Sequence, residues 1–263
     1  MEYQLQKESP IAVFDSGVGG ISVLRELIRI MPQETFIYFG DSKNAPYGTK
    51  KKEEVQKLTV NCAEQLFAQG AKGLVVACNT ATSAAVRLLR EQYPYIPIVG
   101  IEPALKPAAL CMEHPRVLVM ATPMTIHEEK FHHLMKQYED KAEILPLPCP
   151  GLMDFIERGD LDGEDLRKYL EDLLYSYRKD PVDAAVLGCT HYPFVRRQIQ
   201  QVLGESVQIF DGGGGTAREM RRRLAIQGLL REENRQPDTP QVRFENSLAD
   251  ENKIKLCRKL LNI

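Results

Sequence analysis

Residues 73–81 read GLVVACNTA, and residues 184–192 read AAVLGCTHY. Each segment is an apolar run that ends at a cysteine and continues into small or polar residues. The two cysteines, Cys78 and Cys189, lie about 110 positions apart. One repeat at this interval is too little for a solenoid, and it predicts two similar α/β lobes related by pseudo-symmetry.

Apolar runs alternate with segments of helical spacing along the chain. A weaker counterpart of the first repeat pairs IAVFDS (11–16) with RVLVMAT (116–122). The predicted strands are 11–14, 36–39, 74–77, 96–101, 117–121, 144–147, 184–187, 207–210 and 242–244. Continuous apolar strands that alternate with helices are typical of parallel sheets covered by helices on both faces. The predicted fold class is therefore α/β.

Apolar residues at helical spacing predict the connecting helices. They are 20–30, a segment through 55–66, one from Cys78 to about 93, 126–138, 161–177, 194–203, 217–230 and 253–261. Thr125 is the expected N-cap of the fourth helix. The run Gly212–Gly215 favours a flexible turn over an anion-binding nest, and the polar, proline-containing stretch 231–240 is expected to be a loop or linker.

Composition excludes several classes of function. The 263 residues carry a net charge of −2, which gives no global electrostatic reason to bind nucleic acid. No apolar run approaches the length of a membrane-spanning helix, and MEYQLQKESP at the start lacks the apolar core of a signal peptide. We therefore expect a cytoplasmic protein with no membrane or nucleic-acid partner. The six cysteines form no CxxC pair and are expected to be free thiols.

Reactive and hydrogen-bonding residues lie at the ends of the predicted strands. They are Asp15-Ser16, Asp41, Cys78-Asn79-Thr80, Thr122, Cys189-Thr190-His191 and Asp211. In open parallel sheets, ligands bind beyond the carboxyl ends of the strands. Either cysteine alone is more simply a buried apolar residue, but two at equivalent strand ends favour catalysis. His191 and Asp15 are candidate proton-transfer partners, and a helix start after each cysteine would favour the thiolate.

Other features of the sequence have simpler interpretations. The turn DSGVGG (15–20) departs from GxGxxG, so dinucleotide binding is disfavoured, although its amides suit a carboxylate or phosphate. His127, His132 and His133 lack the spacing of a helical metal pair. The basic runs 50–52 and 221–223 are expected on the surface. Cys62, Cys111, Cys149 and Cys257 are expected to be structural. We expect neither a metal nor a cofactor.

Five segments together resemble the glutamate racemases of the cofactor-independent aspartate/glutamate racemase superfamily. They are IAVFDSGVGGISVL (11–24), YFGDSKNAPYG (38–48), VVACNTATSAA (75–85), PIVGIEP (97–103) and LGCTHYPF (187–194). They follow the family order along the chain. One departure is Asp211-Gly212-Gly213, where the family commonly has Asp-Ser-Gly. A second is the segment after Thr122, which is more charged than expected.

The resemblance implies a role for each matching residue. Cys78 would deprotonate D-glutamate with help from Asp15, and Cys189 would deprotonate L-glutamate with help from His191. Glu157, in GLMDFIER, resembles a family glutamate near the second cysteine. The implied substrate-binding residues are Asp15, Ser16, Tyr47, Gly48, Asn79, Thr80, Thr122, Thr190 and His191.

The resemblance also implies the organisation of the molecule. Residues 1–99 and 210–263 would form the first lobe and 100–209 the second, with the active site in the cleft between them. Glutamate would be the substrate, no cofactor would be needed, and a homodimer would supply D-glutamate for bacterial peptidoglycan. Three alternatives stay open: an aspartate racemase, a hydrolase or amidase that uses Cys189 and His191, and a non-catalytic amino-acid binding protein.

Overall fold

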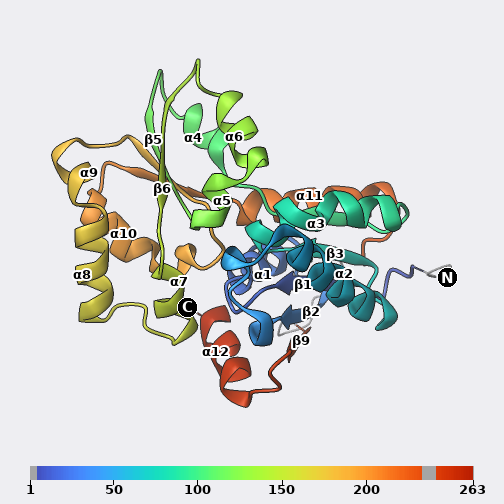
Figure 1. The fold of residues 1–263 in the computed structure, drawn as a ribbon. Coiled ribbons are helices and arrows are strands. Elements are labelled where there is room, and N and C mark those ends of the chain that lie inside the picture. The colour runs from blue at the N-terminus through green and yellow to red at the C-terminus, as the bar shows by residue number, and fades with distance from the viewer. Residues whose placement is uncertain (1–4, 233–240, 263) are drawn as a thin grey trace. The chain divides into compact units, whose positions relative to one another are not determined.

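The computed structural model describes residues 5–232 and 241–262 and divides into two compact units. Unit 1 comprises Met1–Ile101 and Gly213–Ile263, and unit 2 comprises Glu102–Gly212. Each unit is an α/β structure with its own parallel sheet (Figure 1). Most of the predicted 231–240 loop lies outside the described residues. No helix of the described ranges is both long and apolar enough to cross a membrane.

The sheet of unit 1 is parallel throughout, with strand order β4-β3-β1-β2-β9. In chain order the strands are β1 (Ile11–Asp15), β2 (Thr35–Gly40), β3 (Gly73–Val76), β4 (Ile98–Gly100) and β9 (Gln241–Asn246). The helices are α1 (Ile21–Ile30), α2 (Lys52–Ala68), α3 (Asn79–Gln92), α11 (Gly213–Ile226) and α12 (Glu251–Leu261). Two short 3₁₀ turns, η1 (Ser42–Asn44) and η2 (Tyr47–Thr49), follow β2.

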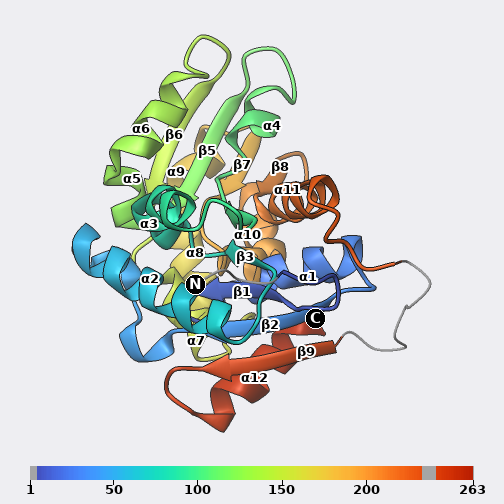
Figure 2. The same cartoon turned by 90° about the vertical axis from the view of Figure 1, so that its right-hand side faces the viewer.

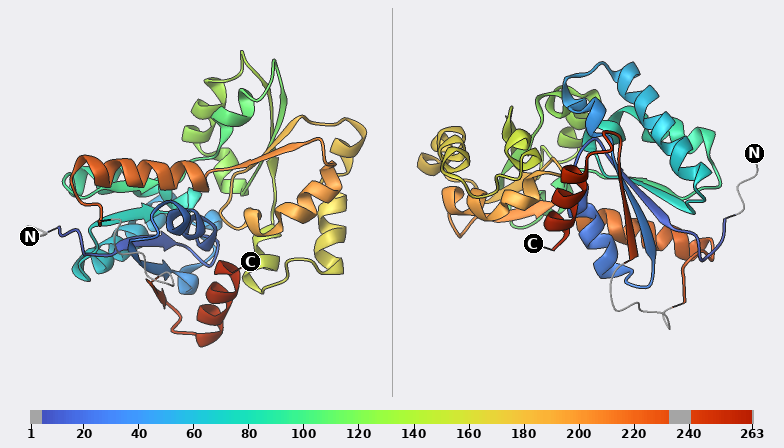
Figure 3. Two further views of the ribbon diagram at one scale, coloured as in Figure 1. Left: turned by 180° about the vertical axis from the view of Figure 1, so that it is seen from behind. Right: turned by 90° about the horizontal axis from the view of Figure 1, so that it is seen from below.

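Helices cover both faces of the unit 1 sheet, as the apolar strands predict. Ala12 and Phe14 of β1 share one buried cluster with residues of α2 and α3. Figure 2 shows α2 and α3 on one side of the sheet and α1 and α11 on the other. The reverse view in Figure 3 shows α11, in orange, running along this unit. Because Ile11–Phe14 of β1 are apolar and buried, the polar side chain of this strand lies at its end, at Asp15.

Unit 2 repeats this plan with four parallel strands in the order β6-β5-β7-β8. The strands are β5 (Arg116–Ala121), β6 (Glu143–Pro148), β7 (Ala184–Leu187) and β8 (Gln208–Asp211). The helices are α4 (Leu105–Ala109), α5 (Pro123–His127), α6 (Glu129–Lys136), α7 (Leu152–Glu157), α8 (Glu164–Leu173), α9 (Tyr175–Lys179) and α10 (Arg196–Leu203), with the 3₁₀ turn η3 (Tyr192–Val195). In both units the strand before a key cysteine, β3 or β7, lies beside the first strand of its unit, β1 or β5.

The predicted strands are confirmed, but several helix predictions are wrong. The helix expected over 126–138 is divided into α5 and α6. Thr122, not Thr125, is the N-cap of α5, because its Oγ1 accepts a hydrogen bond from the Thr125 amide at 3.3 Å. Pro123 occupies the first helical position, where a missing N–H costs nothing.

Four further segments differ from expectation. The helix expected over 161–177 begins only at Glu164 and divides at Leu174 into α8 and α9. The glycine run is no flexible turn, since Gly213–Gly215 form the first turn of α11 directly after β8, with Gly213 buried. Helices α4 and α7 were not predicted, because their five and six residues are too few to show a helical period.

Candidate active site

Cys78 lies just beyond β3 and is the N-cap of α3. Its side chain is 6% exposed. The sulphur accepts hydrogen bonds from the Ala81 amide at 3.5 Å and from the Ser16 hydroxyl at 3.4 Å. Both donors, together with the positive end of the helix dipole, favour a negative charge on the sulphur. Cys78 therefore has the surroundings of a thiolate base.

Asp15 ends the neighbouring strand and is fully buried. Its Oδ1 accepts a hydrogen bond from the Gly17 amide at 2.9 Å, which fixes the carboxylate at the start of the glycine-rich turn. A Cβ atom at Gly20 would lie 2.7 Å from the Cβ of Asp15, so that position requires glycine. Because β1 and β3 pair in parallel, Asp15 and Cys78 follow adjacent strand ends.

Asn79 has a buried side-chain amide that points to a binding role. Its side-chain oxygen and nitrogen are both buried, and neither has a hydrogen-bond partner among the described residues. An unpaired buried polar group costs about 1–3 kcal/mol. Thr80, the next residue, is 4% exposed. A ligand with both donor and acceptor groups, such as an amino acid, would satisfy the Asn79 amide.

Tyr47 and Gly48 lie in η2, after β2. The Tyr47 hydroxyl donates a hydrogen bond to Asp41 Oδ2 at 2.7 Å. Burial raises the pKa of Tyr47 above its ordinary value, as do the hydrogen bond to Asp41 and the nearby charges of Cys62, Asp41 and Cys78. Tyr47 and Cys78 also belong to the same buried cluster of unit 1.

In unit 2, Cys189 lies two residues beyond β7 and is 7% exposed. Its sulphur lies 3.6 Å from Nδ1 of His191, and Nε2 of His191 lies 2.9 Å from Glu157 Oε1. A Cβ atom at Gly188 would lie 2.9 Å from the Met120 carbonyl oxygen, so the turn that presents Cys189 needs glycine there. The three predicted residues thus form a continuous thiol–imidazole–carboxylate chain.

The protonation of His191 depends on these two contacts. Burial of the ring disfavours its charged form, but hydrogen bonds to Cys189 and Glu157 outweigh burial and raise the pKa of His191 above its ordinary value. The imidazolium is therefore stabilised between two groups that carry negative charge. The ring is thereby held between the Cys189 sulphur and the Glu157 carboxylate.

Thr122 and Thr190 follow the carboxyl ends of two paired strands of unit 2, β5 and β7. Thr122 follows β5, and Thr190 is 4% exposed beside Cys189. The Thr122 hydroxyl also lies 2.9 Å from the Thr125 hydroxyl, so its role as a helix cap competes with substrate contact. Asp211, at the end of β8, forms an ion pair with Arg196, a partner that no pattern in the sequence indicates.

The remaining cysteines differ from this pair. Burial, followed by the charge of Cys189, raises the pKa of Cys149 to about 12. Burial, followed by the charge of Asp41, raises the pKa of Cys62 to about 12. Both thiols are neutral near pH 7, as structural cysteines would be. Within the described ranges, no group of three or more histidine, cysteine or acidic residues is placed to hold a metal ion.

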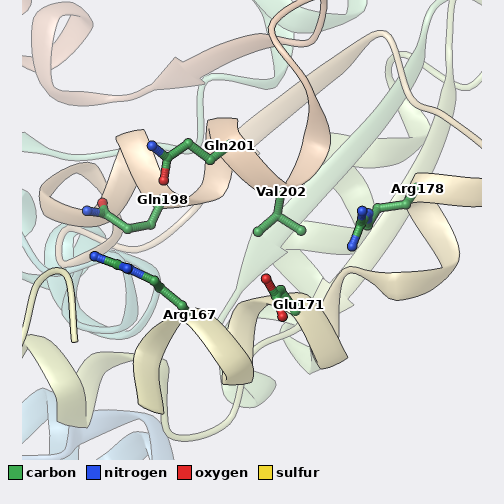
Figure 4. Close-up of a pocket in the computed structure, with 6 residues that line it drawn as sticks. All are labelled: Arg167, Glu171, Arg178, Gln198, Gln201 and Val202. Atoms are coloured by element: carbon green, nitrogen blue, oxygen red, sulfur yellow. The ribbon is translucent and has the colours of Figure 1, made fainter. Parts of the chain in front are cut away.

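A pocket of about 130 Å³ lies elsewhere on unit 2, between α8, α9 and α10 (Figure 4). Its lining residues are Arg167, Glu171, Arg178, Gln198, Gln201 and Val202. None of the predicted site residues lines it, and no pattern in the sequence indicates it. The candidate functional groups are therefore the strand-end residues around Cys78 in unit 1 and those around Cys189 in unit 2.

Comparisons with known proteins identify a family and several relatives of this chain. The profile of the Asp/Glu/Hydantoin racemase family matches residues 11–220. A curated glutamate racemase from Clostridium perfringens is 50% identical over 257 residues, which cover 98% of each chain.

Two solved structures share the fold over nearly the whole chain. A glutamate racemase isoform from Bacillus anthracis superposes with a TM-score of 0.86 at 31% identity, covering 98% of this chain and 96% of that one. The glutamate racemase from Francisella tularensis in complex with D-glutamate gives 0.82 at 28% identity, covering 98% and 95%. The family match spans most of the chain, and the relative from C. perfringens is half identical over nearly all of it, so the chain belongs to the Asp/Glu/hydantoin racemase family.

Proposed function

We propose that this protein interconverts L-glutamate and D-glutamate by proton transfer at Cα, with Cys78 and Cys189 as the two bases. The observation that carries the proposal is the equivalent placement of the two thiols. Each follows the strand that pairs with the first strand of its own sheet, and each sulphur lies within hydrogen-bonding distance of a polar side chain, Ser16 or His191. The half-identical curated glutamate racemases support glutamate as the substrate.

Racemisation at Cα needs a base on one face of the carbon and an acid on the other. With L-glutamate, the Cys189 thiolate takes the α-proton while the Cys78 thiol gives its proton to the opposite face. Cys189 ends as a thiol and Cys78 as a thiolate, which is the state that accepts D-glutamate. Asp15 assists Cys78, and His191 with Glu157 assists Cys189.

The α-proton of an amino acid is only weakly acidic, so the developing carbanion must be stabilised. Preformed hydrogen-bond donors in a buried site lower this barrier without reorganisation. Ser16, Asn79, Thr80 and the Tyr47-Gly48 segment supply such groups in unit 1, and Thr122, Thr190 and His191 supply them in unit 2. The unpaired amide of Asn79 supports a direct contact with the substrate.

The chain of Cys189, His191 and Glu157 also has the form of a nucleophile, a base and an orienting carboxylate. A cysteine hydrolase or amidase is therefore the second candidate function. It would leave the surroundings of Cys78 without a role. An aspartate racemase would use the same residues on a shorter substrate.

The deciding measurement is proton NMR of L-glutamate in D₂O with the purified protein and no added cofactor. Loss of the α-proton signal with decay of optical rotation supports the proposal. If only aspartate exchanges its α-proton, the proposed mechanism stands and the substrate is aspartate. If the folded, reduced protein exchanges neither acid, the proposal is wrong, and a trapped acyl group on Cys189 would support the hydrolase.

We further propose that the protein acts in the cytoplasm as a homodimer and supplies D-glutamate for peptidoglycan. The free state of all six cysteines agrees with a reducing compartment. The dimer and the cell-wall role rest on the resemblance to the family. Light scattering of the purified protein tests the dimer. Rescue by added D-glutamate of cells depleted of the protein tests the role.

A further inference from the structure

Asp41 is a buried carboxylate that the mechanism above leaves without a role. It follows β2 directly and is 2% exposed. Its amide donates a hydrogen bond to the Asp15 carbonyl oxygen at 2.9 Å. The backbone of Asp41 is thereby fixed to the end of β1, whose other neighbour, β3, leads to Cys78.

Three hydrogen bonds converge on the Asp41 side chain. The Tyr47 hydroxyl donates to Oδ2 at 2.7 Å, and Nδ2 of Asn44 lies 3.0 Å from both carboxylate oxygens. No ion pair within the described ranges includes Asp41. Two neutral side chains therefore satisfy this buried charge, and both come from the loop that follows Asp41 in the sequence.

The loop held in this way carries predicted substrate-binding residues. Tyr47 is fully buried, and its ring packs on Phe14 of β1 with centroids 6.2 Å apart. Gly48 is the next residue and is only partly buried. An apolar contact fixes the ring of Tyr47, while the hydrogen bond to Asp41 fixes its hydroxyl. Together these contacts determine where the Tyr47-Gly48 backbone lies.

We propose that Asp41 is a positioning residue for the reaction, which fixes the Asn44–Gly48 loop through Tyr47 and so places the Tyr47-Gly48 segment for substrate binding. The inference rests on the function proposed above. Asp41 acts through Tyr47 and touches no reacting atom. The charge-assisted bond to Tyr47 is the contact that matters most, because it is the shortest of the three.

The first test is a double-mutant cycle of Asp41→Ala and Tyr47→Phe, read as kcat/KM for glutamate. Loss of one charge-assisted hydrogen bond predicts a fall on the order of tenfold or more for Asp41→Ala. The double variant is expected to fall no further than the larger single effect. Multiplicative losses would overturn the proposal, because they would mean that the two residues act independently.

Asp41→Asn and Glu34→Gln separate positioning from stability. The oxygen of the new asparagine can still accept the hydrogen bond from Tyr47, and the side-chain amide of Asn44 can flip so that its oxygen faces the new NH₂ group. We therefore expect Asp41→Asn to keep most of the kcat/KM that Asp41→Ala loses. A loss equal to that of Asp41→Ala would overturn the proposal. Glu34 is a fully buried carboxylate at the opposite edge of the sheet, before β2, and its substitution is expected to lower stability without changing KM.

A turnover-independent readout separates this inference from the proposed function. Glutamate is expected to protect Cys78 from alkylation by iodoacetamide, and Asp41→Ala should raise the glutamate concentration needed for half protection. Unprotected Cys78 in an inactive wild-type protein would contradict the proposed function. If glutamate protects Cys78 in an active wild-type protein, and Asp41→Ala changes neither the protection nor the activity, only the proposed role of Asp41 is overturned.

Discussion

Nε2 of His191 lies 2.9 Å from Glu157 Oε1, so a carboxylate holds the imidazole nitrogen that faces away from Cys189. The contact joins residues 34 positions apart. The hydrogen bond to Cys189 and this one to Glu157 together explain why the pKa of His191 is raised although the ring is buried. Glu157→Gln removes the charge and keeps the shape, so the alkaline limb of the kcat/KM profile is expected to move to lower pH. The matched control is Asp154→Asn, an exposed carboxylate on the same helix.

The same contact predicts how stability depends on pH. A raised pKa in the folded state adds stability that is complete below the unfolded pKa of about 6.5 and is lost as pH rises through the folded value. Glu157→Gln is therefore expected to cost about 1–3 kcal/mol near pH 6 and less near pH 9. Urea unfolding at both pH values measures this. An equal loss at both would show that His191 stays uncharged.

Replacing either cysteine separates the two half-reactions. Cys78→Ser and Cys189→Ser are each expected to abolish net racemisation. In D₂O the Cys78 variant should exchange the α-proton of L-glutamate only, and the Cys189 variant that of D-glutamate only. Cys149→Ser is the matched control, because this buried thiol lies close enough to Cys189 for its pKa to respond. Near-normal racemisation by either active-site variant contradicts the two-base mechanism.

The strand-end residues could be predicted from the sequence, but their partners could not. Apolar runs predict the strands, and the repeated segment at 73–81 and 184–192 points to Cys78 and Cys189. Glu157 followed only from the family resemblance, because α7 is too short for periodicity to reveal. The bond between Asp41 and Tyr47 depends on how the loop folds back, which no local pattern encodes.

The predicted helix boundaries were wrong where capping residues and proline, rather than apolar spacing, determine where a helix begins and ends. The pattern from Ile126 onward suggested one helix, yet Pro123 and the Thr122 cap start it earlier and Glu128 interrupts it. Gly213–Gly215 looked like a turn, because glycine is a poor helix former. In the fold these glycines open α11 immediately after β8, where tertiary packing decides the conformation.

Ser16 is expected to tune the reactivity of Cys78. Its hydroxyl donates to the sulphur at 3.4 Å, so Ser16→Ala removes a group that stabilises the thiolate and should raise the pKa of Cys78. Alkylation of Cys78 against pH measures the shift, with Cys189 as the internal reference. Ser22→Ala, whose hydroxyl bonds to the Gly19 carbonyl instead, should leave the curve in place.

We expect the unpaired side-chain amide of Asn79 to lower stability while it contributes to substrate binding. Asn79→Ala removes two unpaired buried polar atoms, so the melting temperature is expected to stay level or rise. The same variant should raise KM for glutamate and weaken the stabilisation that glutamate gives. Thr82→Ala is the contrasting variant on the same helix. It removes a satisfied bond to the Val76 carbonyl and should lower the melting temperature. A large drop for Asn79→Ala would mean that its amide supports the fold.

The buried pair Lys72 and Glu34 is expected to matter for stability alone. Both side chains are fully buried, with Nζ 2.5 Å from Oε2, and Nζ also donates to the Lys7 carbonyl. Lys72→Met leaves the Glu34 carboxylate with Arg231 as its remaining cationic partner, and breaking a buried pair costs about 3–5 kcal/mol. Adding Glu34→Gln should recover part of that loss, because it removes the uncompensated charge. Urea unfolding of both variants gives the comparison, and the kcat of folded enzyme should not change. If the double variant were less stable than Lys72→Met, Arg231 would have to be the main partner of Glu34.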